Sequence, residues 1–249
     1  MAKLKSLGIL IFWLGVWQLC SMWIDIELLL VSPIDTALRL TKLVQENFFW
    51  LSIATSLERI MGGFLLALLV ASVLAFLAAK VPLVHDFMAP LFNVIKSIPV
   101  ASFIILALVW VKSGYLSTFC SFIMVLPIIY TSLHQGLVSV SKELLEVGEV
   151  YRLSRWSIIK KIYVPSIIPY LISSCSVGLG LAWKSGVAAE VIGLLNSTIG
   201  MQLYNAKVSL EMTDLFAWTL VIVLLSFLLE KIVLLLIKLL DRRFQIMHS

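Results

Sequence analysis

Charged residues and metal-binding side chains are scarce in this sequence. Only 13% of its 249 residues are charged, and it holds three cysteines and three histidines. The cysteines form no CxxC pair and the histidines lack metal-ligand spacing, which argues against a redox centre or a metalloenzyme. A phosphate-binding glycine-lysine motif is also missing, so nucleotide hydrolysis is not expected from this chain. We therefore predict no metal, no cofactor and no enzymatic activity.

Apolar residues make up 61% of the sequence, and its mean hydropathy is +1.06. An ordinary soluble domain has about 45–50% apolar residues and about 25% charged ones. The sequence therefore predicts an all-α polytopic membrane protein with six transmembrane helices in a single domain, residues 1–249. The short third span is included because its neighbours require a return through the membrane. The apolar runs cover residues 7–24, 51–79, 98–111, 116–138, 166–192 and 215–240.

The basic residues are distributed unevenly between the predicted loops. If the N-terminus lies inside, four fall in outer segments: Arg39, Lys42, Lys112 and Lys207. Twelve fall in inner segments: Lys3, Lys5, Lys80, Lys96, Lys142, Arg152, Arg155, Lys160, Lys161, Lys238, Arg242 and Arg243. This asymmetry follows the positive-inside rule and predicts that both termini are cytoplasmic. The net charge of +5 is thus a topology signal, and nucleic-acid binding is not predicted.

Residues 32–49, between the first two spans, have leucines at helical spacing among charged residues. Ser32 before Pro33 is typical of a helix start, since serine caps the first turn and proline fits its first position. We expect an amphipathic helix on the outer surface.

The predicted cytoplasmic loop between the fourth and fifth spans carries a second amphipathic pattern. From Ser141 it reads SKELLEVGEVYRLSRWSIIKKIYVPSIIP. Ser141 is placed to cap a helix. Three glutamates lie on the solvated side of that helix. An apolar ridge on such a helix can dock on another protein, pack against its own bundle or lie on the lipid surface. The ridge follows i, i+3, i+4, i+7 spacing and consists of Leu144, Val147, Gly148 and Tyr151.

This loop resembles the Glu-Ala-Ala loop of permease subunits of bacterial ABC importers, in the branch for sulfonates, taurine, nitrate and thiamine-pyrimidine precursors. The sequence departs from the family pattern twice. Gly148 replaces the usual alanine. Arg152 stands at the glycine position, which argues against a tight turn and favours a helix that runs on. The matching residues are Glu146, Val147, Ser154, Arg155, Trp156 and Pro165.

The resemblance extends over about residues 56–243. SLERIMGGF begins at Ser56 and is similar to the family's serine-leucine-x-arginine start. SIPVASFIILALVW begins at Ser97 and matches the isoleucine-proline segment, and WKSGVAAEVIG begins at Trp183 and matches the tryptophan-to-AAE stretch. These three fragments, Gly114 just beyond the second of them and Pro127 as a kinking proline are five matches in family order around the loop, and together they carry the resemblance.

The resemblance implies a permease domain in the bacterial cytoplasmic membrane that moves a small organic or anionic solute inward by alternating access. It implies three protein partners: a homodimeric cytoplasmic ABC ATPase, an extracytoplasmic solute-binding protein and a second permease copy. The alternative is a membrane anchor or energy-coupling scaffold without a pathway. The residues expected to couple to the ATPase are Leu144, Glu146, Val147, Gly148, Tyr151, Arg152, Arg155 and Pro165.

Ionisable groups inside the spans are candidates for the pathway, because a charge in lipid is costly. Lys184 and Glu190 lie six residues apart in the fifth span, and for each of them snorkelling to water is an equally open alternative. Arg59 can pair with Glu190 or the surroundings of Glu58, or attract an anion from the outside. Gly62 and Gly63, which follow it and permit close helix contact, favour a buried structural role. Small residues recur every four positions in the fifth span and predict close helix packing, within the chain or across a dimer seam. They are Ser174, Gly178, Ala182 and Gly186, and the full set of pathway candidates is Arg59, Pro99, Trp183, Lys184 and Glu190.

Overall fold

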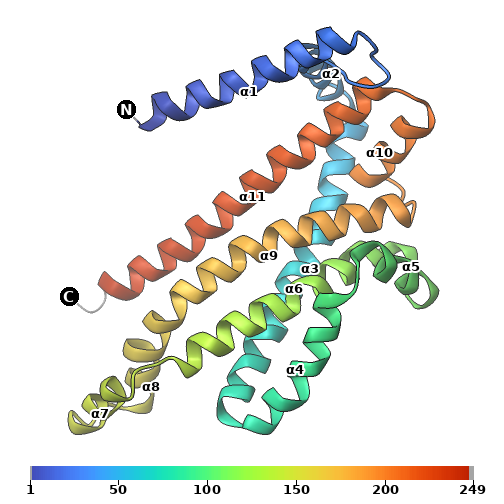
Figure 1. Ribbon diagram of the computed structural model, residues 1–249. Helices are drawn as coiled ribbons and strands as arrows, with labels where there is room; N and C mark the ends of the chain where they lie inside the picture. Colours follow the sequence, from blue (N-terminus) through green and yellow to red (C-terminus); the bar gives the residue numbers. More distant parts are fainter. Residues whose placement is uncertain (1, 247–249) are drawn as a thin grey trace. The chain divides into compact units, whose positions relative to one another are not determined.

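The protein consists of helices throughout residues 2–246, the part that this computed structural model describes (Figure 1). No strand occurs among these residues, which confirms the predicted all-α fold. Four lysines and arginines that the charge pattern places inside, Lys3, Lys238, Arg242 and Arg243, have side chains outside the described set. The elements are α1 (Ala2–Ile24), α2 (Pro33–Leu43), α3 (Asn47–Lys80), α4 (Pro82–Ser97), α5 (Val100–Trp110), α6 (Ser113–Val138), α7 (Lys142–Val150), α8 (Arg155–Ile158), the π-helix η1 (Ile159–Tyr163), α9 (Val164–Ile192), α10 (Ile199–Val208) and α11 (Met212–Ile246).

Five helical stretches are long and apolar enough to cross a membrane: α1, α3, α6, α9 with its preceding short helices, and α11. The remaining candidate is a bent pair. Helices α4 and α5 pass the same criterion only together, and their axes differ by 108°. Among the described residues, the candidate spans therefore number five, or six if the bent pair forms one span. The sequence predicts six transmembrane helices.

The bent pair corrects the prediction for the third span, which placed its start at residue 98. Helix α4 precedes it, and the break falls at Ile98 and Pro99, where Ile98 has an extended backbone. Proline disfavours helical backbone in the residue before it, which explains the position of the break. Lys96, counted above in a cytoplasmic segment, lies in the last turn of α4 and thus inside the pair.

The chain forms two compact units. The first comprises Met1–Leu57 with Leu194–Leu225, and the second Glu58–Gly193 with Ser226–Ser249. In the first unit, Ser32 caps α2 as predicted, because its Oγ accepts a hydrogen bond from the Asp35 N–H at 3.1 Å. Helix α2 ends at Leu43, earlier than the predicted residue 49. The Trp218 ring packs on Phe49, with ring centroids 5.1 Å apart, and forms part of the apolar core of this unit.

The second unit is centred on α6 and α9, which lie side by side along their lengths (Figure 1). The predicted small-residue series of α9 is buried against the same chain. A Cβ on Gly186 would lie 2.5 Å from Ile60 Cγ1 and 2.6 Å from Ser121 Oγ. Ser121 Oγ also donates a hydrogen bond to the Ala182 carbonyl at 3.0 Å. The series therefore lets α9 approach α3 and α6 closely within the chain.

Candidate coupling loop and pathway residues

Helix α7 begins with the cap that the sequence predicts. Ser141 Oγ accepts a hydrogen bond from the Leu144 N–H at 3.3 Å, which satisfies one of the free donors of the first turn. The Ser141 hydroxyl also donates to the Glu143 carboxylate. This hydrogen bond is the main reason why the pKa of Glu143 is lowered from its ordinary value. The start of α7 is thus set by side chains of the loop itself.

The outer side of α7 presents an apolar stripe, defined here as Leu144, Val147, Val150 and Tyr151. Leu144 and Val147 are each 50% exposed, Tyr151 is 76% exposed and Val150 is 80% exposed. Burying such a side chain is worth about 1.5–3 kcal/mol, so a group of four left exposed on one short helix marks a surface that another protein or the lipid surface can cover. The stripe lies outside every candidate span. Val150 was not predicted as part of it.

Gly148, which the sequence placed on the ridge, lies instead on the inner side of α7. It is buried, and a Cβ at this position would lie 3.3 Å from Ile162 Cδ1 and 3.6 Å from Ile158 Cγ1. The predicted ridge is therefore divided between two faces. Gly148 allows α7 to pack closely on the following helices, while Leu144, Val147 and Tyr151 remain exposed.

Helix α7 ends at Val150, and the expectation that it runs on through Arg152 is wrong. Arg152 adopts a left-handed backbone with φ of 50°. The Leu153 N–H donates to the Gly148 carbonyl and the Arg152 N–H to the Glu149 carbonyl, both at 2.9 Å. This pair of bonds is the Schellman motif, in which glycine is the usual residue at the left-handed position. The tight turn of the family pattern is thus present although its glycine is not.

The second half of the loop returns the chain to the membrane. Ser154 caps α8 by accepting a hydrogen bond from the Ser157 N–H at 3.2 Å, and Arg155 follows it. The π-helix η1 then leads directly into α9, where Pro165 occupies the first turn. A proline at this position lacks the N–H that a regular helix would use, and irregular turns commonly accommodate it.

Lys184 and Glu190 lie in contrasting environments on α9. Glu190 has no exposed surface, whereas Lys184 is exposed. Ser117 Oγ on α6 lies 3.4 Å from Glu190 Oε1 and 3.2 Å from the Gly186 carbonyl oxygen. Glu190 is therefore enclosed between α6 and α9 and does not snorkel to water. Lys184 keeps both alternatives that the sequence left open.

The other pathway candidates also divide by exposure. Pro99 is exposed at the break before α5, and Trp183 is only 2% exposed. Arg59 Nη1 and Trp183 Nε1 are buried donors without a hydrogen-bond partner among the described residues. Buried donors are nearly always paired, so these two positions require a partner molecule, water or another conformation of the protein.

Comparison with known proteins decides the family. A family model described as "Binding-protein-dependent transport system inner membrane component" matches residues 50–246, most of the chain. This chain belongs to that family. It is the permease subunit of an ABC importer and a multi-pass protein of the inner membrane. The match begins close to the predicted start of the resemblance and includes the candidate coupling loop.

Three relatives illustrate the range of the family. A probable ABC transporter permease protein of Brucella melitensis is 26% identical over 241 residues, 93% of the permease described here and 95% of the relative. The nitrate import permease protein NrtB of Leptolyngbya laminosa is 26% identical over 197 residues, 72% and 67% of the two chains. The bicarbonate transport system permease protein CmpB of a Synechocystis strain is 27% identical over 150 residues, 60% and 53% of the two chains.

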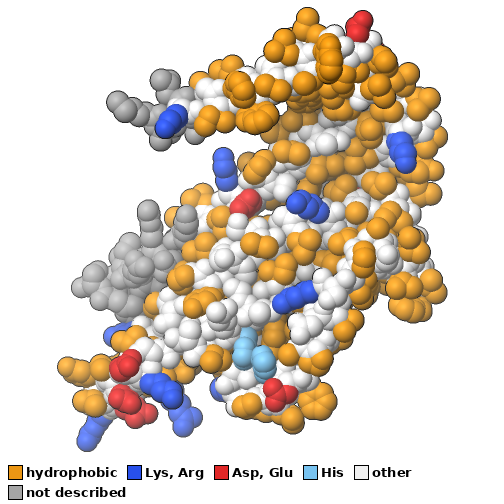
Figure 2. All heavy atoms as spheres, viewed as in Figure 1, with side chains coloured by type: hydrophobic (Ala, Val, Ile, Leu, Met, Phe, Trp, Pro, Cys, Tyr) orange, Lys and Arg blue, Asp and Glu red, His pale blue; other side chains and the backbone are white. Residues whose placement is uncertain are grey.

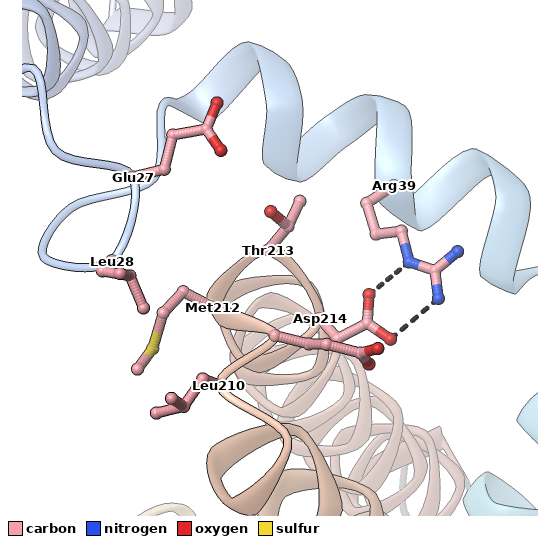
Figure 3. A pocket seen from close by; sticks show the side chains of 8 residues that line it. Glu27, Leu28, Arg39, Leu210, Met212, Thr213 and Asp214 are labelled. Carbon is pink, nitrogen blue, oxygen red and sulfur yellow. Dashed lines mark hydrogen bonds and ion pairs between the residues drawn. The ribbon is translucent and has the colours of Figure 1, made fainter.

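One polar site of the permease was not predicted from the sequence. Arg39 on α2 forms a two-pronged ion pair with Asp214 on α11, in which Nη2 lies 2.8 Å from Oδ2 (Figure 3). The hydrogen bond to Asp214 is the main reason why the pKa of Arg39 is raised. The pair borders a pocket of about 490 Å³ that is also lined by Glu27, Leu28, Leu210, Glu211, Met212 and Thr213. Arg39 and Asp214 are 175 positions apart in the sequence, so no local sequence pattern predicts this ion pair.

Proposed function

We propose that this permease imports a small inorganic oxyanion by alternating access, and that α7 docks on a cytoplasmic ABC ATPase. The proposal includes a second permease copy, an extracytoplasmic solute-binding protein and cytoplasmic termini. The exposed apolar stripe of α7 is the observation that carries the docking of the ATPase.

The stripe supports coupling because of its placement on a stiff, capped helix. Gly148 packs α7 against Ile162 just before α9, so a displacement of α7 would be passed to that span. The Ser141 cap and the Schellman motif at Arg152 close α7 at both ends. A partner that closes around the stripe would therefore move α7 and α9 as a rigid element, as alternating access requires.

The named relatives support an anionic solute. NrtB is named for nitrate import and CmpB for bicarbonate transport. Both solutes are small, planar, singly charged oxyanions at neutral pH. We therefore favour this class over the larger sulfonates, taurine and thiamine precursors that the family resemblance also allowed.

The test is pull-down of the ATPase together with solute uptake in reconstituted vesicles that contain the permease, its ATPase and its binding protein. A charge at the centre of the stripe, Val147→Asp, should lower ATPase recovery and uptake of nitrate or bicarbonate by at least about tenfold, because the carboxylate would have to be desolvated in the interface. Membrane abundance should not change. Gly148→Asp is a poorer test, because it places a carboxylate against Ile162 within the chain.

Lys142→Gln is the matched control. It changes the charge of α7 by the same one unit but lies on the opposite side of the helix from the stripe. Normal ATPase recovery with Val147→Asp would contradict the coupling role of α7. Normal ATPase docking without uptake of any solute would favour the alternative of a scaffold subunit.

A further inference from the structure

Helices α4 and α6 present an exposed face that is polar inside the candidate spans. Figure 2 shows a basic side chain beside the histidine side chains over these two helices. Residues of a span that face lipid are normally apolar, so exposed polar groups at this depth indicate a water-filled space. The residues of this polar face are Asn93, Lys96 and Ser97 on α4, and Thr131 and Gln135 on α6.

Lys96 is the charged centre of the polar face. Its Nζ donates a hydrogen bond to Thr131 Oγ1 at 2.9 Å, and Thr131 Oγ1 in turn donates to the Pro127 carbonyl at 2.6 Å. Thr131 lies seven positions before Val138, the last residue of α6, which places it about 10 Å from the end of this candidate span along the helix axis. The ammonium group is therefore held inside the span.

No acidic side chain neutralises Lys96 in the described part of the chain. Helix α6 contains no Asp or Glu, and the only acidic residue of α4, Asp86, lies 3.5 Å from His85. The ammonium group has three donors, and Thr131 accepts from one of them. The charge of Lys96 is costly inside a span. Its remaining N–H donors and its positive charge are therefore available to an anionic ligand.

We propose that Lys96 binds the transported anion on the α4–α6 face of the translocation pathway. The chemistry selects a small oxyanion, which can accept hydrogen bonds from the ammonium group while Thr131 holds the lysine in place. Gln135, one helical turn from Thr131, supplies a further donor on the same face. This inference rests on the proposed function and specifies a binding group for its solute.

Charge-selective labelling tests the site without knowledge of the solute. In the full complex, with the exposed thiol removed by Cys20→Ser, the substitution Gln135→Cys provides one reporter thiol; Cys120 and Cys175 are buried. We expect the ratio of the rate with an anionic methanethiosulfonate to the rate with a cationic one to be higher at this thiol than at a free thiol in solution. Lys96→Met should reduce this rate ratio about tenfold, since one nearby charge attracts one reagent and repels the other. Lys80→Met, which removes a lysine outside the polar face, should leave the ratio unchanged.

Uptake in reconstituted vesicles provides the second measurement, with nitrate and bicarbonate as the probes. Lys96→Met should lower uptake at least about tenfold, and Lys96→Arg should restore it to within about threefold. Uptake that is unchanged by Lys96→Met would overturn the site while leaving the proposed function in place. If the unaltered complex imports neither nitrate nor bicarbonate, the proposed solute class is wrong. The labelling ratio alone then tests whether Lys96 forms an anion-binding site. A reporter thiol in Gln135→Cys that does not react, or a ratio that Lys96→Met does not change, would also overturn it.

Discussion

Two regions of the permease use glycine for close helix packing: the crossing of α3 and α9 with α6, and the loop helix α7. They differ in their apolar side chains, which are buried at the crossing and partly exposed on α7. At the crossing, Gly63 and Gly186 bring helices together and the surrounding side chains are buried. In the loop, Gly148 also allows close packing, yet Val147 beside it is half exposed. The glycine contacts of the crossing are buried within one chain, whereas the loop helix is buried only on its inner face.

This difference separates stability from coupling. At the crossing, the hydroxyls of Ser117 and Ser121 donate hydrogen bonds to backbone carbonyls of α9. Substitutions there should act on folding. The stripe of α7 has no such partners among the described residues, so substitutions on it should act on assembly and transport while the permease remains folded.

The largest effect is expected from Gly63→Ala. The added Cβ would collide with the backbone carbonyl of Thr118 and lie 2.8 Å from Ser121 Cβ, so α3 and α6 would have to separate. Overpacking of this kind costs about 1–3 kcal/mol of unfolding free energy. Thermal unfolding of the purified permease in detergent and its abundance in the membrane measure the loss.

The neighbouring glycine is the matched control for this substitution. A Cβ on Gly62 would meet only Thr118 Cγ2 at 4.0 Å, so Gly62→Ala should be neutral or slightly stabilising. Equal destabilisation by both substitutions would show that helix separation is not the cause, and the contrast drawn between the crossing and the loop would fail.

A smaller effect of opposite sign is expected from Arg152→Gly. Glycine adopts the left-handed backbone of this position without the steric cost that arginine bears, so the end of α7 should gain about 0.5–1 kcal/mol. Slower hydrogen exchange at the backbone amides of position 152 and Leu153 would report the gain locally. Transport should change little, because the stripe is untouched.

Arg155→Gly serves as the comparison for Arg152→Gly. Arg155 begins α8 without a left-handed backbone, so glycine there should weaken the helix by about 0.5–1 kcal/mol. If both substitutions weaken the loop, the Schellman motif does not govern its stability.

The features that the sequence predicted correctly are those encoded locally. The long apolar runs identified α1, α3, α6, α9 and α11, because each span must satisfy its backbone within one continuous segment. The caps at Ser32 and Ser141 were predictable for the same reason, since each bonds to an N–H three residues away. Local patterns therefore predicted most of the helices and the start of the coupling loop.

The features that were missed depend on contacts between residues far apart in the chain, or on residues that are unusual for the structure they adopt. Helix α4 mixes His85, Asp86 and Lys96 with apolar residues, so no uninterrupted apolar run marks it as a helix of a span. The turn at Arg152 was hidden because arginine replaced the glycine that usually announces it. The inward position of Gly148 was not predictable, since helical spacing gives neighbours on a face but not which face meets the chain.

The smallest effect concerns the pH dependence of α7. The Ser141 hydroxyl lowers the pKa of Glu143, so the ionised carboxylate is favoured in the folded loop. Its contribution to α7 is therefore fully present above the ordinary glutamate pKa and is lost as the pH falls through the lowered value. Ser141→Ala should raise the pKa of Glu143 toward its ordinary value, which a carboxyl NMR titration of the labelled permease measures. Ser154→Ala removes the cap of α8 instead and should leave the Glu143 titration in place. An unchanged pKa of Glu143 in Ser141→Ala would show that the Ser141 hydroxyl does not stabilise this carboxylate. The conclusion that side chains of the loop set the start of α7 would then be wrong.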